Sequence, residues 1–229
     1  MLRDYLKDPQ GNIIHNNGIP QYAAYDSRYG YADPDWIWGF NTSYRYKNWQ
    51  FAVSFDGRVG GMTQSTTQMY MWRSGGHPES VVPERYLDAT VPNSKNYLSE
   101  GVKVVSGTAT FDTYGNILTD TRVFAPNDVK VTYKSYVEAV HKGTAWGGAA
   151  SPLDVLSTTF LKLREMSVSY QLPKTFSSKI AANNISISAV GQNLFMWAKD
   201  FKYSDPDGGS ENFVDPSQRY VGVNLKVEF

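Results

Sequence analysis

The sequence of 229 residues contains no cysteine, which excludes disulfide bonds, a cysteine nucleophile and cysteine-bound zinc. Its 22 basic and 22 acidic side chains balance, which argues against a nucleic-acid-binding face, because such a face needs excess positive charge. No apolar run approaches the roughly 18 residues that a membrane helix requires. Residues 1–6 lack the apolar segment of a signal peptide, so we expect none in this chain.

Motifs for chemistry are lacking as well. The sequence has no nucleophile elbow, no P-loop and no HExxH motif, so we predict neither an enzyme nor a cofactor-binding protein. The three histidines, His15, His77 and His141, are far apart in loop-like sequence, and we expect them at the surface rather than at a metal. Residues 205–211 carry three carboxylates near glycines but lack EF-hand spacing, which favours a turn over a calcium site.

What the sequence does contain is strict period-2 alternation, most clearly in residues 220–229. One face of this stretch is apolar: Val221, Val223, Leu225, Val227 and Phe229. Such a pattern predicts a strand. The apolar face can meet lipid in an outer-membrane barrel or a second sheet in a soluble, carbohydrate-binding or adhesin-like sandwich, and this stretch alone does not decide between them.

A hairpin is predicted from strands at about 36–46 and 49–59, joined by Lys47 and Asn48. A two-residue loop makes Tyr46 and Trp49 neighbours on one face. The apolar sets of both strands then share that face: Trp36, Trp38, Phe40, Tyr44, Trp49, Phe51, Val53 and Phe55. Each strand is about as long as the roughly 9–11 residues that cross a bilayer.

Two further strands are predicted at about 158–172 and 184–196. The alternation in 158–172 changes phase before Met166, which indicates a bulge or a change of environment. Arg164 and Glu165 in this stretch can form an ion pair, but we favour the alternative that each faces water or its own neighbour.

Long connections occupy 60–157 and 197–219. Within the first we expect a short helix between Met62 and Trp72, a small hairpin around residues 114–116, and a helix capped by Asn127 or Asp128. The fold class is therefore all-β: an antiparallel meander of amphipathic strands, with long loops that carry short helices. Long loops on one side and short turns on the other are typical of a bacterial outer-membrane barrel.

Several segments resemble the C-terminal barrel of SusC/RagA-type TonB-dependent transporters, in order from about Tyr5 to Phe229. They are Asp33-Pro34-Asp35-Trp36-Ile37-Trp38-Gly39-Phe40, Tyr46-Lys47-Asn48-Trp49, Asp56-Gly57-Arg58-Val59-Gly60-Gly61, Phe160-Leu161-Lys162-Leu163-Arg164-Glu165 to Leu172-Pro173, and Gly191-Gln192-Asn193-Leu194-Phe195. The resemblance implies part of a 22-stranded transmembrane barrel in the outer membrane, with long extracellular loops. It also implies a SusD-like lipoprotein partner, energy from TonB, and uptake of oligosaccharides or peptides as nutrients. Neither the plug domain nor the TonB-contacting segment is expected in these residues, so the chain alone should not transport anything.

Aromatic residues in or beside the two long loops are the candidates for ligand or partner contact: Tyr70, Trp72, Trp146, Trp197 and Tyr203. They can stack on sugar rings or contact the capping lipoprotein. The alternative, which we favour, is that they belong to interfacial girdles or loop cores.

Overall fold

The computed structural model describes residues 2–141, 151–207 and 217–229, and it divides into two compact units. The sheet unit comprises Tyr31–Thr63 and Ser157–Phe229, and the mixed unit comprises Met1–Gly30 and Gln64–Leu156. In the described ranges, no helix is long and apolar enough to cross a membrane.

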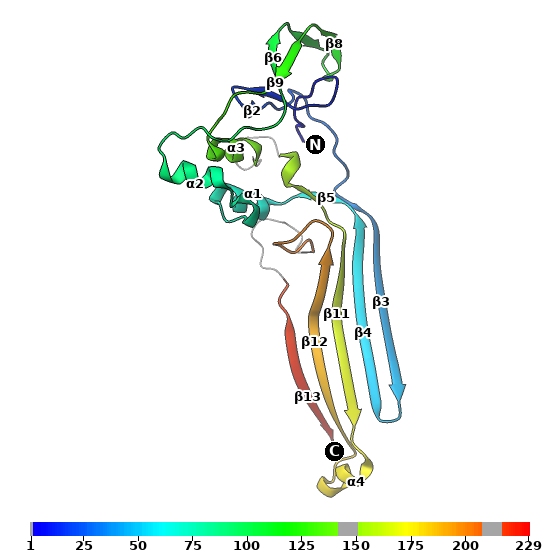
Figure 1. Ribbon diagram of the computed structural model, residues 1–229. Coiled ribbons are helices and arrows are strands. Elements are labelled where there is room, and N and C mark those ends of the chain that lie inside the picture. The colour runs from blue at the N-terminus through cyan, green and yellow to red at the C-terminus, as the bar shows by residue number, and fades with distance from the viewer. Residues whose placement is uncertain (1, 142–150, 208–216) are drawn as a thin grey trace. The chain divides into compact units, whose positions relative to one another are not determined.

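The sheet unit is a five-stranded antiparallel sheet in the order β13-β12-β11-β4-β3 (Figure 1). Its strands lie within two residues of the ranges predicted from the alternation. They are β3 (Pro34–Tyr46), β4 (Trp49–Gly60), β11 (Phe160–Gln171), β12 (Asn184–Ala198) and β13 (Tyr220–Glu228). A short helical turn, α4 (Lys174–Ser177) and η4 (Ser178–Ile180), joins β11 to β12.

The predicted register of the first hairpin is confirmed. Tyr46 pairs with Trp49 and Phe40 pairs with Phe55, so the apolar residues of β3 and β4 share one face. Lys47 adopts a positive φ of 52°, as a two-residue turn requires.

The predicted bulge in β11 is confirmed too. The pairing with β4 shifts between Leu163 and Glu165, so Arg164 is the extra residue. This single insertion keeps Leu163 and Met166 on the same face, although their numbers differ in parity. On β12 the compensating irregularity contains Asn193, whose φ of 51° is left-handed.

The mixed unit gathers the N-terminal residues and most of the predicted long loop. Its strands are β1 (Ile14–Asn16), β2 (Ile19–Pro20), β6 (Val102–Ser106), β7 (Ala109–Phe111), β8 (Ile117–Asp120) and β9 (Val123–Pro126). Its helices are α1 (Thr66–Ser74), η1 (Pro78–Ser80), α2 (Pro83–Thr90), α3 (Tyr133–Val140) and η3 (Pro152–Asp154). A further two-stranded sheet contains β5 (Met62–Gln64) and β10 (Val155–Ser157).

Two expectations for this part of the chain need correction. The fold is not a purely antiparallel meander, because β1 pairs with β6 in parallel. Nor does α3 begin at Asn127 or Asp128, since Thr132 caps it through a 3.1 Å bond from the amide of Ser135. The side chain of Asn127 is already engaged by Ser99 and Val129 and forms a turn instead. The small hairpin around residues 114–116 is present as β7 and β8, and the flanking strands β6 and β9 pair with each other in a separate sheet.

Local signals explain the helix that carries Trp72. Ser65 caps α1 by accepting a 3.1 Å hydrogen bond from the amide of Gln68, and Gly75 ends it with a φ of 76°. Met69 faces inward and is fully buried. The buried apolar residues of the mixed unit include Ile14, Met69, Val131, Tyr133, Val137 and Val140.

Candidate functional site

The apolar face of the five-stranded sheet is the largest candidate surface of the sheet unit. Alternate rows of the register place apolar side chains from neighbouring strands together on one face. One row crosses the whole sheet: Tyr46, Trp49, Tyr170, Ile187 and Leu225. Because the bulge at Arg164 restores the phase of the alternation, the apolar columns on both sides of it fall on this one face.

These apolar side chains are exposed. Trp36 is 72% exposed, Phe40 55%, Val221 78% and Leu225 62%. A soluble monomer rarely leaves so broad a continuous apolar patch in water. The face therefore indicates an apolar environment outside the chain.

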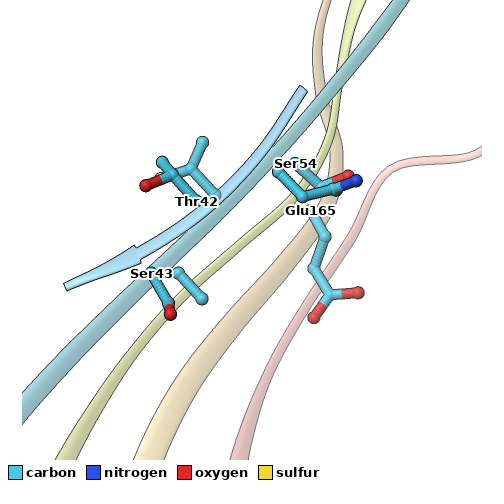
Figure 2. Close-up of a pocket in the computed structure, with 7 residues that line it drawn as sticks. Thr42, Ser43, Ser54 and Glu165 are labelled. Atoms are coloured by element: carbon cyan, nitrogen blue, oxygen red, sulfur yellow. The ribbon is translucent and has the colours of Figure 1, made fainter. Parts of the chain in front are cut away.

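The opposite face is mainly polar, with Ile37 and Met196 as exposed apolar exceptions near one end. Gln50, Ser54, Ser169 and Ser186 occupy it, in positions that alternate with the apolar columns. Around the middle of β3, β4 and β11 lies a shallow depression lined by Asn41, Thr42, Ser43, Ala52, Val53, Ser54 and Glu165. Figure 2 shows Glu165 projecting beside Ser54, its partner in the register.

A charged network lies on the polar face near the start of β11. Lys162 is only 1% exposed, and its Nζ lies 2.6 Å from Asp205 Oδ2, 3.3 Å from Asp207 Oδ2 and 3.1 Å from Ser217 Oγ. Burial raises the pKa of Asp205, but hydrogen bonds from Lys162 and Ser217 outweigh it and hold the pKa at about 2. The network thus fastens the segment after β12 to the sheet.

Two arginines complete the network. Arg164 donates from Nε and Nη2 to the two carboxylate oxygens of Asp56, each at 2.8 Å, and Nη2 also contacts Asp207. Arg58 lies 3.6 Å from Asp207. Three cations and three carboxylates therefore compensate one another, as buried or half-buried charges must.

The network revises one expectation and supports another. Arg164 is paired with Asp56 across the strands and does not simply face water or its neighbour Glu165. Asp205 and Asp207 are engaged by cationic side chains, and in the part of the chain that the structure describes no group of three or more acidic, cysteine or histidine residues is arranged to hold a metal ion. The turn interpretation is supported by the 2.9 Å bond from the amide of Asp207 to Asp205 Oδ1.

A second cluster, in the mixed unit, is built around Trp72. The indole is stacked between two imidazoles, with ring centroids 4.2 Å from His77 and 4.7 Å from His141. His141 Nδ1 lies 2.8 Å from Oδ1 of Asp154, which is fully buried. His77 Nδ1 accepts the amide N–H of Glu79 at 3.2 Å and so caps η1.

The expectation of surface histidines was wrong. His77 and His141 are buried in this cluster, and His15 is buried against Ser99, 3.0 Å away. Apart from hydrogen bonds to Ile13 and Glu79, two residues away, their partners lie 5 to 84 residues away, so the local pattern does not reveal the burial. The only sequence signal was the coincidence of histidine with an aromatic-rich loop.

We expect replacement of His141 to lower the folding stability of the mixed unit by an amount that depends on pH. Burial raises the pKa of Asp154, and the hydrogen bond with His141 opposes that rise. Oδ2 of Asp154 has no partner among the described atoms. His141→Leu should leave the whole carboxylate unpaired and destabilise the unit by about 1–3 kcal/mol at neutral pH. A group with a raised folded-state pKa favours folding below its unfolded pKa, so the deficit should shrink in acid and grow as pH rises.

Thermal unfolding followed by near-UV circular dichroism measures this change across pH. The double variant His141→Leu/Asp154→Leu is the control, because removing both partners costs far less than removing one. Equal destabilisation of the single and double variants would contradict the pairing.

The five aromatic candidates do not converge. Tyr70 and Trp72 lie two positions apart on α1, and such neighbours do not share a helix face. Trp197 is exposed on the apolar face of the sheet opposite Leu161, and Tyr203 is exposed after β12. Trp146 lies outside the described residues.

The sequence analysis did not identify Lys162, Asp205 and Asp207 as members of a charged network. Two sequence signals were available: two cations on one strand, and the Asp-Pro-Asp sequence of the turn.

Comparison with known proteins relates this chain to a family of membrane receptors. No protein-family model matches the sequence. TonB-dependent receptor P3 of Formosa agariphila is 21% identical over 224 residues, which is 97% of this chain and 18% of the relative. This chain is homologous to TonB-dependent receptors.

Solved structures support the same fold. The RagAB peptide importer matches in its closed-closed state with a TM-score of 0.54 at 16% identity, and in its open-open state with 0.55 at 14%. Each match covers 100% of this chain and 22% of the solved chain. The chain thus spans about a fifth of the length of the TonB-dependent receptors it resembles, and its mostly β architecture corresponds to part of such a transporter. These relatives are transporters and not enzymes.

Proposed function

We propose that this chain is the C-terminal part of the barrel of an outer-membrane, TonB-dependent nutrient importer, with all of residues 1–229 belonging to that barrel and its loops. The carrying observation is the apolar face, which is continuous across five strands and exposed. In a barrel wall this face meets lipid, and the polar face with Glu165 and the charged network meets the lumen. Five strands are too few to close a barrel of 22, so transport belongs to the whole protein.

A soluble sandwich is the competing fold, and the exposure of the apolar face disfavours it. In a sandwich the inner face packs on a second sheet about 10 Å away. Trp36 and Leu225, at opposite edges of the sheet, are instead more than half exposed. Their exposure supports the barrel.

For substrate and partner, the proposal follows the relatives. The solved RagAB structures are of a peptide importer, which favours peptides over oligosaccharides as cargo. A SusD-like surface lipoprotein would cap the barrel, and TonB would act on other parts of the whole protein. Tyr70, Trp72, Trp197 and Tyr203, with Trp146, remain the aromatic candidates for contact with cargo or lipoprotein.

Fractionation of cells that express the full-length parent tests the proposal. We expect the parent in the outer membrane, with the mobility on gels changing on heating, as folded barrels show. Recovery of the parent in a soluble fraction would contradict it. Growth of a strain lacking the gene on peptides or on glycans as sole nutrient then separates the two cargo classes.

We also expect the isolated chain to depend on detergent. Its apolar face and its two unpaired edge strands, β3 and β13, both favour association in water. Size-exclusion chromatography with light scattering should therefore show aggregates without detergent. A monodisperse monomer in plain buffer would favour the sandwich.

A further inference from the structure

One end of the sheet unit carries a strong excess of positive charge. The β3–β4 turn, the α4 turn and the end of β13 lie together there (Figure 1). Asn48 accepts the amide of Gln171, and Glu228 accepts the amide of Asn183, which ties the three segments to one another. Residues 45–50, 169–186 and 224–229 contain five basic side chains, Arg45, Lys47, Lys174, Lys179 and Lys226, and one acidic side chain, Glu228.

These cations divide into two groups. Arg45 and Lys226 lie on the polar face of the strands, where they line a polar depression together with Lys47 of the turn, and Lys226 is paired with Glu228. Lys174 and Lys179 lie in the α4 turn, and Lys47 lies in the β3–β4 turn. No ion pair involving these three turn lysines occurs among the described residues.

The α4 turn exposes its large apolar residues and buries its small ones. Phe176 is 56% exposed and Ile180 is 54% exposed, whereas Ser177 and Ala182 are buried. The turn is nevertheless well defined: the amide of Phe176 bonds to Pro173 at 2.9 Å and that of Ala182 to Ser177 at 3.0 Å. The turn therefore presents two large apolar side chains at the surface.

Two of the turn lysines lie over exposed aromatic rings. Lys47 Nζ is 5.3 Å from the centroid of the Tyr46 ring, and Lys179 Nζ is 5.5 Å from that of Phe176. Beside them is the aromatic row of the apolar face, where Trp49 and Tyr170 have centroids 4.7 Å apart. Aromatic side chains next to lysines are typical of the boundary between acyl chains and head groups.

We propose that this end of the sheet binds anionic phospholipid head groups through Lys47, Lys174 and Lys179, with Phe176 and Ile180 inserted at the acyl boundary. The inference rests on the proposed function, because it requires the apolar face to lie in a bilayer. The three turn lysines would attract the negative charge of the head groups. The one acidic side chain nearby, Glu228, does not neutralise them, because it is paired with Lys226. Each lysine near an anionic surface strengthens binding by about fivefold.

The full-length parent in mixed micelles provides the test. Phosphatidylglycerol and phosphatidylcholine are offered together, and native mass spectrometry counts the lipids that remain bound. Lys174→Gln/Lys179→Gln should lower the preference for phosphatidylglycerol by about twenty-fivefold. Arg45→Gln/Lys226→Gln removes two charges at the same end from the polar face and should leave the preference unchanged. Phe176→Ser/Ile180→Ser should lower retention of both lipids.

Each outcome decides the inference. Loss of the preference in the lysine variant alone, and its weakening at high salt, support head-group binding. Unchanged preference in that variant overturns it. Loss only in Arg45→Gln/Lys226→Gln also overturns it, because the head group would then bind in the depression on the polar face. Failure of the wild-type parent to retain either lipid overturns the proposed function itself, which distinguishes that failure from a lack of lipid selectivity.

Discussion

Arginine in place of Leu225 should sharply reduce the amount of folded parent barrel, whereas arginine in place of its neighbour Asn224 should be tolerated. Leu225 is 62% exposed on the apolar face and pairs with Ile187 in the row that crosses all five strands. Asn224 pairs with Ser188 on the polar face. An arginine on the lipid face at mid-membrane costs roughly 2–4 kcal/mol, a cost that a lumen position avoids.

Heat-modifiable mobility of the full-length parent, in vesicles of one lipid composition, reports the folded fraction of each variant. The two substitutions add the same side chain to the same strand, so differences in charge, size and edge position cancel. Equal folding of the two variants would mean that the apolar face does not meet lipid.

The faces of the sheet could be predicted from the sequence because period-2 alternation is a local property. Tyr46 and Trp49 were placed together by the length of the turn alone, and the structure pairs them. The phase change before Met166 revealed the bulge at Arg164, since only an inserted residue keeps Leu163 and Met166 on one face. In both cases the information lies within a few residues.

The mixed unit could not be predicted in the same way. Its compactness depends on contacts between distant segments, such as the parallel pairing of Ile14 with Val102. The cluster around Trp72 likewise brings together His77, His141 and Asp154 from three segments. Each histidine looked like a polar loop residue, because burial depends on tertiary packing and not on neighbours in sequence.

The charged network shows the same limit within the sheet unit. Lys162 and Arg164 were visible as two cations on one strand, and residues 205–207 as a turn. The 43 residues that separate Lys162 from Asp205 hide the pairing. Without it, a calcium site and a solvated turn were the natural interpretations of Asp205 and Asp207.

The second large effect is therefore expected at Lys162. Lys162→Met should destabilise the attachment of the segment after β12 by about 3–5 kcal/mol, because it leaves the Asp205 carboxylate buried without its cation. Trypsin sites at Lys199 and Lys202 lie in this segment, so the rate of cleavage there should rise steeply. Cleavage at the wild-type rate would show that the network does not hold the segment.

A matched control exists in the mixed unit. Lys103 Nζ also lies 2.6 Å from a carboxylate, that of Asp128, but this pair is exposed. Lys103→Met should cost no more than about 1 kcal/mol and leave cleavage at Lys199 and Lys202 unchanged. A difference between the two variants would show the effect of burial, because both pairs join a lysine to an aspartate at the same distance.

Acid should release the same segment in wild-type protein, and only at very low pH. The pKa of Asp205 is lowered from 3.8 in the unfolded chain to about 2 in the folded state. A carboxylate with a lowered pKa stabilises the folded state fully at pH values above its unfolded pKa, and it loses that contribution as the pH falls through its folded pKa.

Hydrogen exchange at two amides measures this release. The amides of Asp207 and Ser217 donate to Asp205, at 2.9 and 3.2 Å, so their protection from exchange reports whether the Asp205 carboxylate is ionised. Protection should persist at about pH 4 and disappear towards about pH 2. In Lys162→Met, Asp205 lacks its main cation, so its protection should disappear at a higher pH; identical midpoints in the two proteins would mean that Lys162 does not set this pKa.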